Sequence, residues 1–278
     1  GKLAAHMPGG SLDQGDIRFT VSNEPADVVV VLNYMKYDTV LSSKRGYVWA
    51  WHNEPINRKP FARGFDRIMT NEKSSDPRIV PAPPILDWWV KKTWDELADL
   101  NPPSKTQDLS VIASRKSMIA GHRRRLEFVR LIEESLPEAD IFGEGRTQVL
   151  EDKWDGLADY KFSIAIENTS KEDYWTEKIS DCFLSYTVPL YFGATNIDDY
   201  FPTESYIWLP IDDPEAARAI VEEVVRTDLW EERLPAVREA RDLVLYRYSL
   251  FGQISTVVRQ EANQILDAPV GRVRVHGR

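Results

Sequence analysis

A dense group of polar and charged residues, from Glu167 to Lys178, lies between an apolar run at 162–168 and a helix predicted over 176–186. Ligands of open α/β sheets bind beyond the carboxyl ends of the strands, and this group lies at such an end. The start of the helix offers free backbone N–H groups, and Lys178 adds a positive charge in the first turn. These features predict a diphosphate site. The alternative is a structural role, in which Asp173 or Thr176 caps the helix and Glu177 interacts favourably with its dipole.

A second group is the basic run His122-Arg123-Arg124-Arg125, which opens a helix predicted over 123–136. Positive side chains at the start of a helix oppose its dipole, so three arginines there are unfavourable unless a negative group compensates. A bound phosphate would compensate. The alternative is a solvated basic edge that pairs with nearby glutamates.

A third group ends a strand predicted over 47–53 and includes Trp51, His52 and Glu54. Aromatic rings beside a carboxylate and an imidazole suit a sugar, because its C–H faces pack on rings while its hydroxyls bond to polar groups. The carboxylate could act there as a base. The alternative is a buried strand that ends in a turn.

The elements that would position these groups form two successive α/β segments. Apolar runs without alternation, such as 27–33, indicate parallel strands covered on both faces. After a linker-like stretch at 97–108, strands alternate with helices as in a doubly wound sheet. The strands are predicted at 17–22, 27–33, 47–53, 67–70, 109–114, 139–143, 162–168 and 188–193, and the chain beyond Pro214 is predicted to be helical.

Three parts follow from this pattern. Residues 1–9 read as cloning-derived or disordered. Residues 10–104 are predicted to form one domain. Residues 105–278 are predicted to form a second domain that includes the C-terminal helices.

The composition excludes several classes of protein. The chain has 278 residues, with 35 Lys and Arg against 44 Asp and Glu, and its formal net charge of −9 argues against nucleic-acid binding. No apolar run approaches the roughly 18 residues that a membrane span requires. The single cysteine, Cys182, allows no internal disulfide and fits a reducing compartment. We therefore expect a cytoplasmic protein, or one peripheral to a membrane.

The segment Tyr160–Pro202 resembles the C-terminal signature of glycosyltransferase family 10, the α1,3/4-fucosyltransferases. That signature is YKF, an apolar strand, EN, a short loop, Y-x-TEK, a helix and VP-x-x-x-G, and every element is present in this order. Weaker similarity covers 111–129 and the strand and turn near Glu54. The resemblance implies an α/β fold of the GT-B type, in which two Rossmann-like lobes face a cleft and a helical C-terminal tail follows. Residues 10–104 would be the acceptor side, and 105–278 would bind the nucleotide sugar.

The resemblance also implies roles for single residues. Glu177 would bind a ribose hydroxyl of the donor GDP-fucose, and Lys178 would bind its diphosphate. Arg125, selected by the spacing R-x-x-aromatic, would bind the diphosphate as well. The remaining donor-side residues would be Glu167, Asn168 and Tyr174.

For the catalytic base, the resemblance points to Glu54 in HNEPIN, and an alternative alignment points to His52. Trp51 would lie on the acceptor side. The implied reaction is a single inverting displacement, in which the base takes a proton from an acceptor hydroxyl as GDP leaves from the opposite face. Because Lys178 and Arg125 can neutralise the leaving group, no metal or other cofactor is expected to be obligatory.

The expected partners are a GDP-sugar donor and an oligosaccharide or glycoconjugate acceptor with an α1,3-type linkage. The expected setting is a bacterial cytoplasm, or the membrane surface where glycans are assembled. Two acidic pairs, Asp198-Asp199 and Asp212-Asp213, are expected to cap turns or helices rather than bind a metal. Two alternatives stay open: the same fold using another nucleotide sugar, and a non-catalytic module that binds a carbohydrate or nucleotide.

Overall fold

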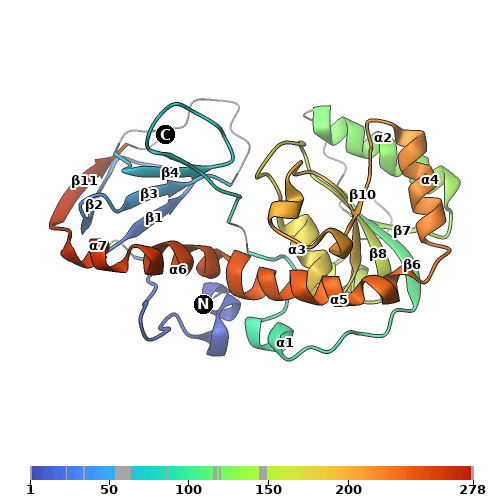
Figure 1. The fold of residues 1–278 in the computed structure, drawn as a ribbon, viewed down its shortest axis with the longest axis horizontal. Helices are drawn as coiled ribbons and strands as arrows, with labels where there is room; N and C mark the ends of the chain where they lie inside the picture. The colour runs from blue at the N-terminus through green and yellow to red at the C-terminus, as the bar shows by residue number, and fades with distance from the viewer. Residues whose placement is uncertain are drawn as a thin grey trace. The chain divides into compact units, whose positions relative to one another are not determined.

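A computed structural model describes the chain at residues 2–22, 24–33, 35–53, 64–85, 87–114, 118, 120–143 and 149–276. The chain divides into two compact units (Figure 1). The first combines residues 1–86 with residues 247–278, and the second contains residues 87–246. Within the described ranges, no helix has the length and apolar character needed to cross a membrane.

The first unit contains a four-stranded parallel sheet with the strand order β1-β3-β4-β5. A separate antiparallel pair joins β2 to β11. The strands are β1 (Val29–Leu32), β2 (Thr39–Lys44), β3 (Val48–Trp51), β4 (Arg67–Thr70), β5 (Ile79–Pro81) and β11 (Val270–Val275). The predicted strands at 27–33, 47–53 and 67–70 are confirmed. The strand predicted at 17–22 is wrong, because the structure has only an isolated bridge between Asp13 and Arg18 there.

The parallel sheet of the first unit is covered on both faces. On one face, Trp49 and Trp51 pack with Phe251 and Ile254 of α6 (Leu250–Gln260), and α7 (Ala262–Asp267) adds to the same core. On the other face, Val48 and the remaining inward residues pack against the β2–β11 pair. All four residues of β3 are buried. Successive residues of a strand point to opposite faces of the sheet, so this burial agrees with a sheet that is covered on both faces.

The boundaries of this unit differ from the predicted division at 104. Residues 247–278 belong to the first unit because α6 fills one of its cores and β11 pairs with β2. Residues 2–10 also differ from the expected disordered end. They form the short turns η1 (Lys2–His6) and η2 (Pro8–Gly10), and Met7 between them is buried in the core that α6 covers.

The second unit is built on a five-stranded parallel sheet with the order β10-β9-β8-β6-β7. Its strands are β6 (Gln107–Ile112), β7 (Asp140–Phe142), β8 (Tyr160–Ile166), β9 (Val188–Phe192) and β10 (Ile207–Trp208). Its helices and turns are α1 (Trp94–Ala98), α2 (Ala120–Ser135), η3 (Lys153–Gly156), α3 (Glu177–Leu184), η4 (Ile197–Asp199), η5 (Thr203–Ser205), α4 (Pro214–Val224) and α5 (Leu229–Asp242), and a π-helical turn, η6 (Leu243–Tyr248), follows. The predicted doubly wound sheet is confirmed.

The strand order places a topological switch point between β6 and β8. The chain runs from β6 outward to β7, returns to β8, and then continues in the other direction to β9 and β10. Ligands of doubly wound sheets bind beyond the carboxyl ends of the strands at such a point. Two segments lie there: the start of α2, which follows β6, and residues 167–176, which follow β8.

The predicted helical tail beyond Pro214 is confirmed over most of its length. α4, α5, α6 and α7 fall within it. The tail does not end as a helix, because residues 270–275 form β11. Alternating exposure along this strand, with Val275 fully buried, fits a strand at the edge of a small sheet.

Candidate functional site

A buried carboxylate at the end of β8 fixes the first turn of α3. Glu167 directly follows β8 and is 1% exposed. The backbone N–H of Thr176 donates to Glu167 Oε1 at 2.8 Å, and the Thr176 hydroxyl lies 2.8 Å from both carboxylate oxygens. Burial raises the pKa of Glu167, and the charge of Lys178 opposes that rise. Thr176 is the N-cap of α3, so the predicted capping role is confirmed for this residue.

Lys178 points its ammonium group back toward the end of β8. Its Nζ lies 3.0 Å from Glu167 Oε2, 3.0 Å from Thr176 Oγ1 and 3.6 Å from Glu177 Oε1. Burial alone would lower the pKa of Lys178, but the two carboxylates outweigh it and raise the pKa. The lysine is therefore a fixed positive charge at the switch point.

Arg125 reaches the same place from α2. Its Nη1 donates to Asn168 Oδ1 at 2.9 Å. Burial lowers the pKa of Arg125, and Glu167 and Glu177 oppose that shift through their charges. The other arginines of the run differ, since Arg123 is exposed and Arg124 pairs with the exposed Asp212. The structure thus brings Arg125 together with Asn168 and with the carboxylates that hold Lys178.

Two glycines allow this close approach, and sequence reasoning did not select either. A Cβ on Gly121, in the first turn of α2, would lie 1.7 Å from the carbonyl oxygen of Asn168. A Cβ on Gly193, directly after β9, would lie 2.6 Å from Cγ of Glu167. The atoms nearest to such a Cβ on Gly121 belong to the backbone of Asn168, which cannot move aside as a side chain could. Only glycine therefore lets the first turn of α2 pack against the segment that follows β8.

The loop between Asn168 and Thr176 is closed by a polar contact from the segment after β9. Asp173 has a φ of 58° and lies in the left-handed region. Its backbone N–H donates to Asn196 Oδ1 at 2.8 Å, and Asn196 Nδ2 donates back to its carboxylate at 2.9 Å. Asp173 therefore holds the loop and does not cap α3. Tyr174, predicted to line the donor site, is 2% exposed and belongs to the core beneath the loop.

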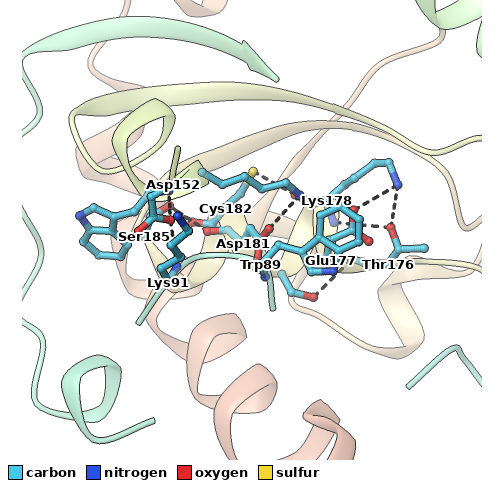
Figure 2. A network of polar contacts seen from close by, with 12 residues as sticks. Trp89, Lys91, Asp152, Thr176, Glu177, Lys178, Asp181, Cys182 and Ser185 are labelled. Atoms are coloured by element: carbon cyan, nitrogen blue, oxygen red, sulfur yellow. Dashed lines mark hydrogen bonds and ion pairs between the residues drawn. The ribbon is translucent and has the colours of Figure 1, made fainter. Parts of the chain in front are cut away.

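A charged network that sequence reasoning missed continues from Glu177 along α3. Lys153 Nζ, from η3, lies 3.4 Å from Glu177 Oε1 and 3.1 Å from Asp181 Oδ2. Figure 2 shows Glu177 and Asp181 on successive turns of the helix, with Trp89 close to both. The backbone N–H of Trp89 donates to Asp181 Oδ1 at 2.9 Å. The sequence feature that could have indicated this network is Asp181, an acidic residue four positions after Glu177. It lies on a helix whose residues 179–184 are all buried.

The region holds three carboxyl groups, on Glu167, Glu177 and Asp181, and three basic groups, on Arg125, Lys153 and Lys178. A diphosphate would bring further negative charge to the two cations at the strand ends, Arg125 and Lys178, which can form charge-assisted hydrogen bonds with it. In the described part of the chain, no group of three or more His, Cys, Asp or Glu side chains is arranged to hold a metal ion. Of the acidic pairs, Asp213 caps α4 through Ala216 N–H, as expected.

The candidate residues of the first unit lie at the end of β3. His52 is 8% exposed, its backbone N–H donates to Met69 O at 2.9 Å, and burial lowers its pKa. Glu54 lies outside the described residues. Trp51 is in the core and donates its indole N–H to Pro83 O at 2.9 Å, so it offers no ring surface to a sugar. The acceptor-side prediction for Trp51 is therefore wrong, and the alternative of a buried strand holds for it.

Residues 102–229 match the family model described as the C-terminal part of glycosyltransferase family 10, the fucosyltransferases. Over this segment, slightly less than half of its length, the chain is similar to glycosyltransferase family 10. A fucosyltransferase-like protein of Arabidopsis thaliana is 30% identical to it over 146 residues, which is 50% of this chain and 26% of that protein. An α-(1,4)-fucosyltransferase of the same plant is 49% identical over 51 residues, or 18% of this chain and 13% of that protein. The chain thus spans about a quarter or less of the length of these relatives.

The fold of this chain also resembles solved structures. A crystal structure of an α1,3-fucosyltransferase with GDP superposes with a TM-score of 0.51 and 19% identity, covering 78% of this chain and 71% of that chain. The match over 102–229 agrees with the expected family, and the expected GT-B fold class, with two α/β units built on parallel sheets, is confirmed. The matched family segment contains β6, α2, β8 and α3, and so every residue of the switch-point site.

Proposed function

We propose that the chain is a glycosyltransferase of family 10, which transfers fucose from GDP-fucose to a hydroxyl group of a glycan with inversion at the anomeric carbon. The observation that carries the proposal is the meeting of Arg125, from α2, with the Glu167–Lys178 pair at the switch point of the second unit. Nucleotide phosphates bind at this position in doubly wound sheets. The family match over the same residues supports fucose as the sugar.

In this proposal, Lys178 and Arg125 bind the diphosphate and stabilise the negative charge that develops on it as the sugar leaves. One such contact typically lowers a barrier by about 3 kcal/mol, or roughly a hundredfold in rate. Because both charges come from the protein, we propose that a divalent metal is not obligatory. Glu177 would bind a ribose hydroxyl, and Asn168 would hold Arg125 in position.

We propose Glu54 as the base that takes the proton from the acceptor hydroxyl, with His52 as its alternative. Buried carboxylates can have a pKa raised toward neutrality, which suits a general base. His52 has a pKa lowered by burial, so it is neutral near pH 7 and able to accept a proton. The acceptor would be an oligosaccharide or glycoconjugate, and an α1,3-type linkage is proposed from the family resemblance.

A competition experiment tests the donor. Transfer to a panel of glycan acceptors is measured with GDP-fucose, GDP-mannose and UDP-sugars, with EDTA present and absent. We expect turnover with GDP-fucose alone, competition by GDP, and equal rates with and without EDTA. Binding of a UDP-sugar in preference to GDP would contradict the donor assignment. Binding of GDP without product from any acceptor would favour a non-catalytic module.

Glu54→Gln tests the base. General-base catalysis typically contributes a factor of about 100 or more, so turnover should fall by that factor while GDP affinity stays within about twofold. The matched variant is His52→Gln. Unchanged turnover in Glu54→Gln together with a large loss in His52→Gln would assign the base to the histidine.

A further inference from the structure

Lys153 is a partly buried cation that neither the family signature nor the diphosphate assignment uses. It lies between two carboxylates of α3, with Nζ at 3.1 Å from Asp181 Oδ2 and 3.4 Å from Glu177 Oε1. Its side chain is 21% exposed, and that of Asp181 is 1% exposed. Burial would lower the pKa of Lys153, but Asp181 and Glu177 outweigh it and raise the pKa. The ammonium group is therefore charged where it meets Glu177.

The position of Lys153 is fixed from several directions. It begins η3, whose N-cap Asp152 accepts hydrogen bonds from Trp154 N–H at 3.0 Å and from Lys91 N–H at 2.9 Å. The segment that contains Lys91 also contacts α3, because the backbone N–H of Trp89 donates to Asp181 Oδ1. The ring of Trp89, although 60% exposed, lies against the ammonium group, with its centroid 4.6 Å from Lys153 Nζ. Figure 2 shows Trp89, Lys91 and Asp152 along the network that includes Glu177.

Lys153 contacts Glu177 at one carboxylate oxygen, Oε1. Lys153 and Lys178 both approach Oε1, at 3.4 and 3.6 Å, so the carboxyl group is oriented by two cations from different elements. An ionised carboxylate has about four lone-pair sites, which leaves capacity for a hydroxyl donor. A carboxylate that is held before the ligand arrives loses little freedom on binding.

We propose that Lys153 is a positioning residue, which holds the Glu177 carboxylate in the orientation that accepts a hydrogen bond from a ribose hydroxyl of the nucleotide. This inference rests on the proposed function, since it assumes that a nucleotide binds at the switch point. Lys153 itself would not touch the nucleotide. Asp181 and Trp89 would serve the same purpose by fixing Lys153.

The test compares binding of GDP with binding of 2′,3′-dideoxy-GDP, which lacks both ribose hydroxyls. A hydrogen bond from a hydroxyl to a charged acceptor predicts that the wild-type chain prefers GDP by roughly 10- to 100-fold in calorimetric affinity. In Lys153→Met combined with Asp181→Asn, one positive and one negative charge are removed together, so the network stays balanced. We expect the preference in this double variant to fall below about threefold, with dideoxy-GDP affinity within about threefold of wild type.

Two further variants separate positioning from folding. Lys153→Arg keeps the charge and should restore the preference for GDP. Lys161→Met removes a lysine of the same unit, which pairs with the exposed Asp108 at 2.9 Å, and should leave the preference unchanged. Binding of dideoxy-GDP reports a folded site, so a variant that fails to fold is recognised because it binds neither nucleotide. In that case the ratio of GDP affinity to dideoxy-GDP affinity in Lys153→Arg tests the role of Lys153.

The outcomes distinguish this inference from the proposed function. A wild-type chain that binds neither nucleotide contradicts the proposed function. A wild-type chain that binds both equally, or a folded double variant that keeps the full preference, overturns the role of Lys153.

Discussion

The carboxyl ends of the two parallel sheets carry polar residues of different kinds. In the second unit, Glu167 at the end of β8 accepts hydrogen bonds from Thr176 and Lys178 at the start of α3, and Arg125 of α2 donates to Asn168. In the first unit, His52 Nε2 and both side-chain atoms of Asn71, which follows β4, are buried without a hydrogen-bond partner in the described part of the chain. Buried polar atoms normally have partners, so those of the first unit must be met by water, a ligand or residues outside the described ranges. Arg125 Nε in the second unit is also buried without such a partner, but there the carboxylate, the N-cap threonine and the lysine bond to one another, which His52 Nε2 and the Asn71 side chain do not.

The largest effect expected from this difference is at Arg125. Arg125→Ala removes the cation that bonds to Asn168 and faces Glu167, and GDP affinity should fall by about 30- to 100-fold, or about 2–3 kcal/mol. The matched control is Arg124→Ala on the same helical turn. Its partner Asp212 is 74% exposed, so the change should be below about twofold. Equal losses in both variants, measured by calorimetry, would mean that α2 acts through general positive charge alone.

A smaller effect is expected at Gly121. A Cβ there would meet the backbone carbonyl of Asn168 at 1.7 Å, so Gly121→Ala must displace α2 or the loop. We expect the free energy of unfolding to fall by about 1–3 kcal/mol, with a parallel loss of GDP affinity. Gly271→Ala in the first unit is the control. Its nearest neighbour is Cγ of the flexible Arg45 side chain at 3.0 Å, and the expected change is within about 0.5 kcal/mol. Similar thermal unfolding of the two variants would contradict the close approach at the switch point.

The smallest effect concerns His52 and pH. Burial lowers the folded-state pKa below the usual value of 6.5, so the unfolded chain takes up a proton first as the pH falls. The folded state therefore keeps its full stability above pH 6.5 and loses some as the pH drops through the folded-state pKa. The slope from this group is at most about 1.4 kcal/mol per pH unit. His52→Gln should flatten the decline between pH 6.5 and 5 in denaturant unfolding. Superimposable curves for wild type and His52→Gln would contradict a buried neutral imidazole.

The sequence predicted the site of the second unit better than that of the first because its residues are close together along the chain. Glu167, Thr176 and Lys178 span one strand end and one helix start, so periodicity and capping rules place them correctly. Similar reasoning about a helix start pointed to the basic run after the other strand at the switch point, and the family resemblance selected Arg125 within that run. Lys153 did not, because it lies in a short turn without a regular period, and its partners are known only once η3 packs on α3.

Trp51 and the C-terminal segment show why the first unit was harder to predict. The run 47–53 fits both an exposed platform and a buried strand, and the choice depends on what covers the sheet. The elements that cover this sheet come from distant parts of the sequence. α6 packs on one face, and β11 packs with β2 on the other. No local pattern reveals a pairing between residues 39–44 and 270–275. The boundary at 86, rather than 104, has the same cause.

The return of the chain to its first unit has a consequence for biosynthesis. During synthesis, residues 29–81 emerge from the ribosome long before α6 and β11 have been made. The apolar faces that these two elements cover therefore stay exposed while the second unit is synthesised. The second unit, whose strands are contiguous in sequence, can mature during that interval. Shortening the chain before residue 250 would therefore leave the later-numbered sheet intact and expose the earlier one to aggregation.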